Sequence, residues 1–253
     1  MLAHRDCSYG TLSELELEGY CDFGFPIGHL VARQADLRAT NTQLDEVIRA
    51  FARVFDGRDI VTARLLAACR AHLALMHSAG AALRLVARDL EGNLRKVEGR
   101  VRTSPEACRT LTSLLELERQ SEAHDGNVLA DASAAMGLLW IRRSLAFQSH
   151  LYDAFVPAGA LHPKEAALEA YTEHLSPYHG WMLRKIFGTL FSGMPGRDAC
   201  MAVFGGVTVH ELDRDKEHTI AEKVRALTGT LKPLLEALKD SFEKLNLEDT
   251  RRI

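Results

Sequence analysis

An acid, an amide and a base share one expected helix face in the octet Asp89–Lys96. Asp89, Asn93 and Lys96 stand at positions i, i+4 and i+7, which at 3.6 residues per turn fall within an arc of roughly 60°. A carboxylate, a carboxamide and an ammonium that face the same way can hydrogen-bond a polar ligand. Taken alone, the octet is more typical of a solvated helix face with a favourable acid-before-base order.

Gly92 lies inside the same octet, after an apolar segment that contains Leu85, Val86 and Leu90. A glycine in the middle of a helix costs about 1 kcal/mol relative to alanine. We interpret Gly92 as a place where another helix or a ligand comes close.

A second segment carries polar groups on an apolar face. Trp140 and Arg143 share a helical stripe with Met136, Phe147 and Leu151. An indole is a good platform for stacking against a sugar ring, and it has one N–H donor. Considered without its context, the same stripe fits a core tryptophan beside an arginine that extends to solvent.

A third segment begins at Tyr178-His-Gly-Trp181. The spacing places His179 on one helix face with Leu183 and Leu190, where a single histidine is usually a hydrogen-bonded core residue. Trp181 points roughly 200° away from His179, and Lys185 follows it. This tryptophan fits either a membrane-interface anchor or a ring packed under the N-terminal segment.

These residues favour binding over catalysis. The sequence contains no nucleophile elbow, zinc-protease motif, P-loop or dinucleotide fingerprint. His210, Asp213 and His218 follow a glycine-rich break, but their spacing matches no metal-ligand pattern, and we interpret them as a solvated turn. We therefore expect no enzyme, no cofactor and no metal ion.

Composition limits the class of protein. The chain has 253 residues with 47% hydrophobic and 26% charged residues, which are ordinary globular values. A net charge of −3 argues against nucleic-acid binding through bulk charge. No apolar run is long enough to span a membrane, and no secretory signal is recognised. The five cysteines form no C-x-x-C pair, which fits free thiols in a reducing, cytoplasmic compartment.

The elements that must position these residues are helices. Apolar periodicity and capping signals predict eight of them, near 40–55, 60–77, 81–101, 105–120, 128–155, 164–174, 177–192 and 216–245. Residues 197–209 are undecided, and no strand alternation is strong enough to name. We expect an irregular N-terminal extension over 1–38 and an all-α domain over 39–253.

The three segments together resemble the glycolipid transfer protein family. The similarity extends from about Ala39 to the C-terminus and rests on Asp89-x-x-x-Asn93-x-x-Lys96, on Leu139-Trp-Ile-Arg-Arg143 with Phe147, and on Tyr178-His-Gly-Trp181 with Lys185-Ile-Phe187. The resemblance implies a two-layer helical sandwich of about eight helices enclosing one lipid.

The family's site residues can be carried over to the matching positions. The resemblance implies a head-group site at Asp89, Asn93, Lys96, Trp140 and His179, with Arg143 beside it. It implies an acyl-chain tunnel lined by Phe147, Leu151, Leu175, Phe187, Leu190 and Phe191. It also implies membrane docking through Trp181, with Lys185 nearby.

Simple chemistry agrees with these roles. A buried ceramide amide needs one acceptor and one donor, because each unsatisfied group costs about 1–3 kcal/mol. Asp89 and His179 supply them, and Trp140 with Asn93 and Lys96 offers a stacking surface with directional polar groups.

A related branch of the family binds ceramide-1-phosphate through cationic residues and lacks the stacking tryptophan. Trp140 and Asn93 favour the sugar-binding branch, whereas Lys96, Arg143 and Arg100 keep the phosphate alternative open. Two features depart from the family pattern. The N-terminal segment is longer than usual, and residues near Leu247 replace a tail that carries a tyrosine.

The expected function is therefore non-enzymatic transfer of a sphingolipid between membranes. A glycosphingolipid is the favoured cargo, ceramide-1-phosphate the alternative, and transient contact with a membrane surface is implied. A third interpretation is a lipid-sensing scaffold that holds a protein partner through residues 1–38.

Overall fold

The computed structural model describes residues 42–78, 81–157 and 159–253, all within the compact unit Asp36–Ile253, so the extension predicted for 1–38 lies outside the described residues. In chain order the helices are α2 (Gln43–Ala52), α3 (Thr62–Ser78), α4 (Ala81–Thr103), α5 (Leu111–Arg119), α6 (Ala134–Phe155), α7 (Pro163–His174), α8 (Trp181–Ser192), α9 (Arg197–Gly205) and α10 (Arg214–Lys244). The prediction of an all-α class is confirmed.

Local sequence explains where the helices begin. Thr42 and Asp45 form a reciprocal capping box at α2, in which the Thr42 N–H donates to the Asp45 carboxylate at 2.9 Å. Ser133 caps α6 by accepting from the Met136 N–H at 3.0 Å. Asp213 caps α10 in the same way, with the Lys216 N–H at 2.8 Å.

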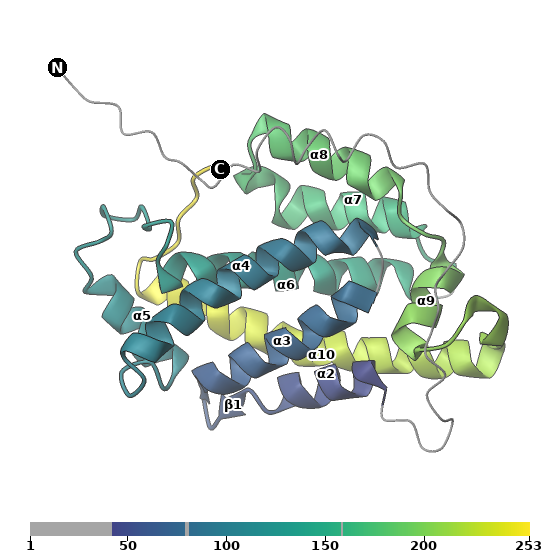
Figure 1. Cartoon of the computed structure of the whole chain (residues 1–253), viewed down its shortest axis with the longest axis horizontal. Coiled ribbons are helices and arrows are strands. Elements are labelled where there is room, and N and C mark those ends of the chain that lie inside the picture. Colours follow the sequence, from purple (N-terminus) through teal and green to yellow (C-terminus); the bar gives the residue numbers. More distant parts are fainter. Residues whose placement is uncertain (1–41, 79–80, 158) are drawn as a thin grey trace. The chain divides into compact units, whose positions relative to one another are not determined.

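Helix α6 is the centre of the core. Most of its side chains are buried, as expected for a helix that is apolar nearly all round. It packs against α4, α7 and α10, while α3 packs against α2 and α4. Figure 1 shows α4 crossing in front of α6 and α3 in front of α10, which gives two helical layers, with α7 and α8 together at the top of the view.

A glycine sets the distance between the two layers at the site. A Cβ atom on Gly137 of α6 would lie 2.7 Å from the Asn93 carbonyl oxygen and 3.2 Å from the Lys96 Cβ on α4. The close approach that we attributed to Gly92 is therefore made by Gly137. A Cβ on Gly92 would meet nothing within 4 Å, so the expectation of a close helix at Gly92 is wrong, while the close approach of a ligand stays a prediction.

Some predicted boundaries are also wrong. Helix α5 begins at Leu111 instead of at Pro105, because Thr110 forms the capping box with Ser113. Thr110 also makes an isolated antiparallel β-bridge with Val61, so the backbone just before α5 is extended. Helix α6 begins at Ala134, and not at 128. A short antiparallel hairpin of β1 (Phe55–Asp56) and β2 (Asp59–Ile60) was not predicted, since two-residue strands are too short to show alternation.

The predicted helix start at 177 is likewise displaced. Ser176–Tyr178 form a separate 3₁₀ turn, and Gly180 is the N-cap of α8. His179 therefore lies before α8 in extended backbone, with ψ 137°, and not on a face of that helix as we had expected. No helix of the described residues is long and apolar enough to cross a bilayer.

Candidate ligand-binding site

The three polar residues of α4 form one hydrogen-bonded row. The Asn93 Nδ2 donates to the Asp89 carbonyl at 3.0 Å and to the Asp89 carboxylate at 3.2 Å. The Lys96 ammonium donates to the Asn93 Oδ1 at 3.1 Å. Asn93 is buried, Lys96 is half-buried and Asp89 is exposed. The helix thus presents a carboxylate and an ammonium joined through an amide.

Desolvation by the surrounding protein disfavours the charged forms of both Asp89 and Lys96. Desolvation raises the pKa of the Asp89 carboxyl, against the charge of Lys96 and the hydrogen bond from Asn93. Desolvation also lowers the pKa of Lys96, against the charges of Asp89 and Asp131. The Asp89 side chain is exposed by surface area, so water reduces the size of its pKa shift. The upward direction means that the carboxylate is poorly solvated and would be stabilised by a hydrogen-bond donor from a ligand.

Trp140 of α6 is enclosed by three neighbours. Its ring is stacked on His179, with centroids 5.4 Å apart and planes 20° apart, and Tyr178 meets it edge-on at 6.4 Å. The Arg143 guanidinium lies 5.0 Å from the indole centroid and 3.4 Å from the Tyr178 ring. Only 4% of Trp140 is exposed. A sugar can therefore stack on this indole only after one of the neighbours moves.

His179 is held by a residue that the sequence did not indicate. Tyr171 of α7 places its hydroxyl 3.0 Å from the His179 Nδ1. Burial, together with the positive charges of Arg143 and Arg184, lowers the pKa of His179 to about 4, so the ring is neutral at pH 7. When Tyr171 donates to Nδ1, the proton of the neutral ring is on Nε2, which leaves an N–H donor for a ligand.

The residues predicted for the acyl chains gather between α6, α7 and α8. Phe147, Leu151, Leu175, Phe187 and Phe191 are buried, and Leu190 is half-buried. The Phe147 and Phe191 rings stack at 5.9 Å, and the Phe187 and Phe191 centroids are 5.7 Å apart.

This aromatic cluster is closed on itself and touches the polar site. Tyr171 lies 5.0 Å from Phe187, and His179 stacks on Phe187 at 5.2 Å. Hydrocarbon chains would have to part these rings. Helix α8 is suited to that movement because its main packing partner is α7.

The other side of α8 faces solvent. Trp181 is 71% exposed and Met182 is 53% exposed, and Arg184 and Lys185 are exposed on the same helix. Large exposed apolar side chains beside cations are typical of a surface that contacts a membrane or a partner.

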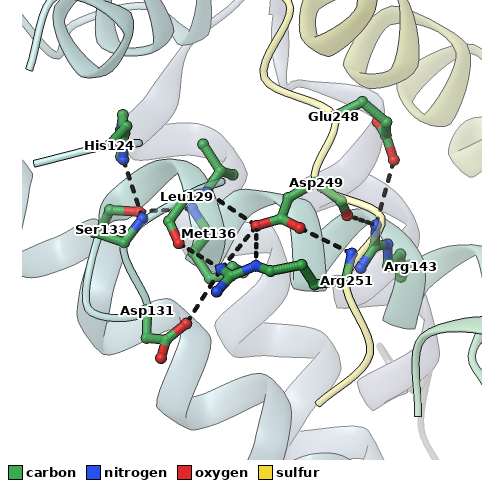
Figure 2. A network of polar contacts seen from close by, with 10 residues as sticks. His124, Leu129, Asp131, Ser133, Met136, Arg143, Glu248, Asp249 and Arg251 are labelled. Carbon is green, nitrogen blue, oxygen red and sulfur yellow. Dashed lines mark hydrogen bonds and ion pairs between the residues drawn. The ribbon is translucent and has the colours of Figure 1, made fainter. Parts of the chain in front are cut away.

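The C-terminal tail, residues 246–253, forms a polar network with Arg143 and with the segment before α6, as Figure 2 shows. The Arg143 Nη2 donates to the Asp249 carbonyl oxygen at 2.5 Å and lies 3.4 Å from the Glu248 carboxylate. The buried Asp249 carboxylate accepts from the Leu129 N–H at 2.9 Å and from the Arg251 Nε at 2.8 Å. This network orients Arg143 against Trp140.

The last residue is paired with the segment that carries His179. The Ile253 N–H donates to the Tyr178 carbonyl at 2.9 Å, and the Gly180 N–H donates to the Ile253 carbonyl at 2.6 Å. A Cβ on Gly180 would lie 2.9 Å from the Ile253 oxygen. Sequence reasoning noted the tail only as a departure from the family, because residues 246–253 form no helix or strand that periodicity could reveal.

Comparison with known proteins places these residues in a family. The profile described as Glycolipid transfer protein (GLTP) matches residues 60–206, which run from α3 through α9. The chain belongs to the glycolipid transfer protein family. The matched part includes the α4 row, Trp140 and His179, whereas the tail lies beyond it.

Two relatives within the family show how far the sequence similarity reaches. Glycolipid transfer protein of Xenopus tropicalis is 29% identical over 167 residues, covering 63% of this chain and 75% of its own length. Glycolipid transfer protein 1 of Arabidopsis thaliana is 26% identical over 151 residues, covering 60% and 73%.

Solved structures agree on the fold. A fungal glycolipid transfer protein superposes with a TM-score of 0.69 at 22% identity, covering 82% of this chain and 100% of the other. Mouse ceramide-1-phosphate transfer protein superposes with a TM-score of 0.71 at 18% identity, covering 82% and 98%. The two-layer helical fold of the family is therefore present here, and the fold alone does not distinguish the two kinds of cargo.

Proposed function

We propose that this protein is a non-enzymatic carrier that moves a sphingolipid, preferably a glycosphingolipid, between membranes. The observation that carries the proposal is the position of the Trp140–His179 stack. On one side, α4 contacts α6 through Asn93 and Lys96 at Gly137, which lies three residues before Trp140. On the other side, His179 stacks on Phe187 of the aromatic cluster. A polar row at one end and a closed aromatic cluster at the other suit a lipid with a polar head and apolar chains.

The amide of a ceramide would lie at the boundary between these two regions. The Asp89 carboxylate would accept from the amide N–H, and the His179 Nε2–H would donate to the amide carbonyl. Tyr171 supports the second role by fixing the histidine from Nδ1. Both ligand groups would then be satisfied, which avoids about 1–3 kcal/mol of desolvation cost for each.

Charge favours a sugar over a phosphate. Of the cations near the site, Arg143 already faces Glu248 and the Asp249 carbonyl, and Arg100 forms an ion pair with Glu118 at 3.0 Å. Desolvation also lowers the pKa of Lys96. A phosphate bound by Arg143 or Arg100 would require that arginine to leave its partner. The similarity to a ceramide-1-phosphate transfer protein keeps that lipid as the second candidate.

Transfer assays with two lipids test this proposal. Glucosylceramide and ceramide-1-phosphate are offered side by side in donor vesicles, and we expect faster transfer of glucosylceramide. Trp140→Ala and Asp89→Val should each reduce that rate by roughly tenfold or more, the equivalent of ~1.4 kcal/mol. Arg88→Ala, which alters the exposed residue next to Asp89, is the matched control and should transfer normally.

Three results would change the conclusion. Faster transfer of ceramide-1-phosphate would establish the second candidate. Binding of either lipid without transfer would indicate a sensor. Normal transfer by both site variants would remove the proposed head-group site.

A further inference from the structure

Two histidines and a glutamate converge between α6 and α7, away from the proposed head-group residues. His150 lies ten residues after Trp140, about 15 Å further along α6. Its Nδ1 is 3.2 Å from the Nε2 of His174 at the C-terminal end of α7. Among the described residues, His150, Glu173 and His174 form the one group of three whose ligand atoms all lie within 4.8 Å of one another.

The distances between these atoms match a metal-binding arrangement. Zinc bonds to imidazole nitrogen and carboxylate oxygen are about 2.0–2.2 Å long, so neighbouring donors in a tetrahedron are about 3.3–3.6 Å apart. The two imidazole nitrogens here are 3.2 Å apart. Glu173 carboxylate oxygens lie 3.3 Å from the His150 Nδ1 and 3.7 Å from the His174 Nε2. One donor atom from each of the three residues thus lies within 4.8 Å of the other two, which is close enough for all three to bind one ion after small side-chain movements.

A second carboxylate supports the same assignment independently. Glu169, one turn before Glu173, places an oxygen 3.4 Å from the Nε2 of His150. A metal-binding histidine usually donates its other ring N–H to a carboxylate, which fixes the tautomer and increases its basicity. With its proton directed at Glu169 through Nε2, His150 turns the lone pair of Nδ1 towards His174 and Glu173.

The site is accessible to a metal ion and to water. A surface hollow of about 610 Å³ adjoins it and is lined by residues that include His150, Glu165 and Glu169. The two histidines are half-buried, and Glu173 is exposed. Solvent therefore reaches the three donors from the exposed Glu173 side.

We propose that His150, Glu173 and His174 bind a divalent transition-metal ion, with zinc the best match, and that Glu169 orients His150. Imidazole ligands select zinc and its neighbours over magnesium and calcium, which prefer oxygen. The ion would fasten the end of α7 to α6. Because α7 also carries Tyr171, which holds His179, this site would stiffen the support of the lipid site from the opposite side.

Metal titration of the untagged full chain, after treatment with a chelator, tests the proposal. Elemental analysis and calorimetry should find about one zinc ion bound per chain and no comparable magnesium binding. His174→Ala and Glu173→Gln should each weaken zinc binding by at least about tenfold, and Glu169→Gln by about tenfold or more. Cobalt should give the visible absorption of a tetrahedral site in the wild type and lose it in His174→Ala.

The matched control is His218→Ala, since His218 is an exposed histidine on α10 that pairs with Glu222. It should bind zinc as the wild type does. Circular dichroism checks that every variant is folded. If the His174 variant does not fold, Glu173→Gln still tests the site, because Glu173 is exposed and its replacement should not disturb the fold. A wild-type chain that binds no zinc, or site variants that bind it as tightly as the wild type, would refute the proposal.

Discussion

At the scale of single residues, two buried histidines are neutral at pH 7, and one of them, His179, lies in the proposed site. His179 is buried among Trp140, Tyr171 and Phe187. His72 is wholly buried elsewhere in the core, 3.2 Å from the Tyr152 hydroxyl. Burial lowers the pKa of both rings from 6.5 to about 4. Each ring is therefore able to accept or donate a hydrogen bond at neutral pH without carrying charge into the core.

This depression of the pKa predicts how stability changes with pH. Between pH 6.5 and about 4 the unfolded chain binds protons at these histidines and the native chain does not. Stability is thus fully present above pH 6.5 and falls as the pH decreases towards 4, by at most about 1.4 kcal/mol per pH unit for each ring. Urea unfolding at pH 7 and pH 5 measures the fall.

Two variants assign that fall to its source. His72→Gln and His179→Gln should each show a smaller difference between the two pH values than the wild type. His218→Gln, at an exposed position, should keep the full difference. If all three chains lose the same stability on acidification, other groups are responsible.

Residue types were more predictable than residue contacts. Asp89, Asn93 and Lys96 were placed on one face by spacing, and the structure joins them by hydrogen bonds. Tyr171 was missed, because its hydroxyl reaches a residue beyond the end of its own helix. The His150–His174 pair was missed for the same reason: the two rings come from different helices, and no local motif connects them.

At the scale of helices, the contact of α4 with α6 brings the polar row to the indole. Gly137→Ala should force these helices apart, since the new Cβ would meet a backbone oxygen at 2.7 Å that cannot rotate away. We expect a loss of about 1–3 kcal/mol in the free energy of unfolding, together with slower lipid transfer. Chemical denaturation and the vesicle assay measure the two effects.

Gly92→Ala is the matched control for this prediction. It makes the same substitution on the facing helix, where the added methyl meets open space. It should raise stability by about 0.5–1 kcal/mol through helix propensity alone and leave transfer unchanged. Equal behaviour of the two variants would contradict the packing role given to Gly137.

Helix α8 carries the surface proposed to contact membranes. Trp181→Ala should slow transfer by about tenfold, because membrane binding scales with the apolar area that is buried. It should leave stability nearly unchanged, as the side chain is 71% exposed. Val209→Ala removes another exposed apolar side chain, 48% exposed, from a different part of the chain. Vesicle sedimentation should show weaker binding only for the α8 variant.

Helix boundaries show where sequence patterns succeed and fail. The start of α10 at Arg214 and the end of α7 at His174 agree with the prediction to within a few residues, because apolar periodicity is clear on both helices. The displaced start of α8 has a tertiary cause. The Gly180 N–H bonds to Ile253, far away in the sequence, and no local pattern contains that information.

At the scale of the whole molecule, the C-terminal tail (residues 246–253) is hydrogen-bonded to α6 and to the segment that precedes α6. Asp249 is its anchor, since it accepts hydrogen bonds from both Leu129 and Arg251 while buried. Asp249→Ala would leave the Leu129 N–H unsatisfied and should cost about 1–3 kcal/mol of stability. Asp240→Ala changes an exposed aspartate on α10 and should cost little.

Urea unfolding compares these two variants directly. Because the tail also orients Arg143, the Asp249 variant should transfer lipid more slowly even at temperatures where it is folded. Unchanged stability and unchanged transfer in Asp249→Ala would show that the tail has no part in the site.

The contrast between the two tryptophans gives the protein an optical property. The chain has 2 tryptophans, of which Trp140 is 4% exposed and Trp181 is 71% exposed. The enclosed indole should fluoresce at shorter wavelength than the exposed one. The two indoles should also respond to different events. Bromine atoms in bilayer lipids should quench Trp181, whereas a bound head group should change the emission of Trp140 by displacing its ring neighbours. Docking and loading can therefore be followed separately in real time, without any added dye.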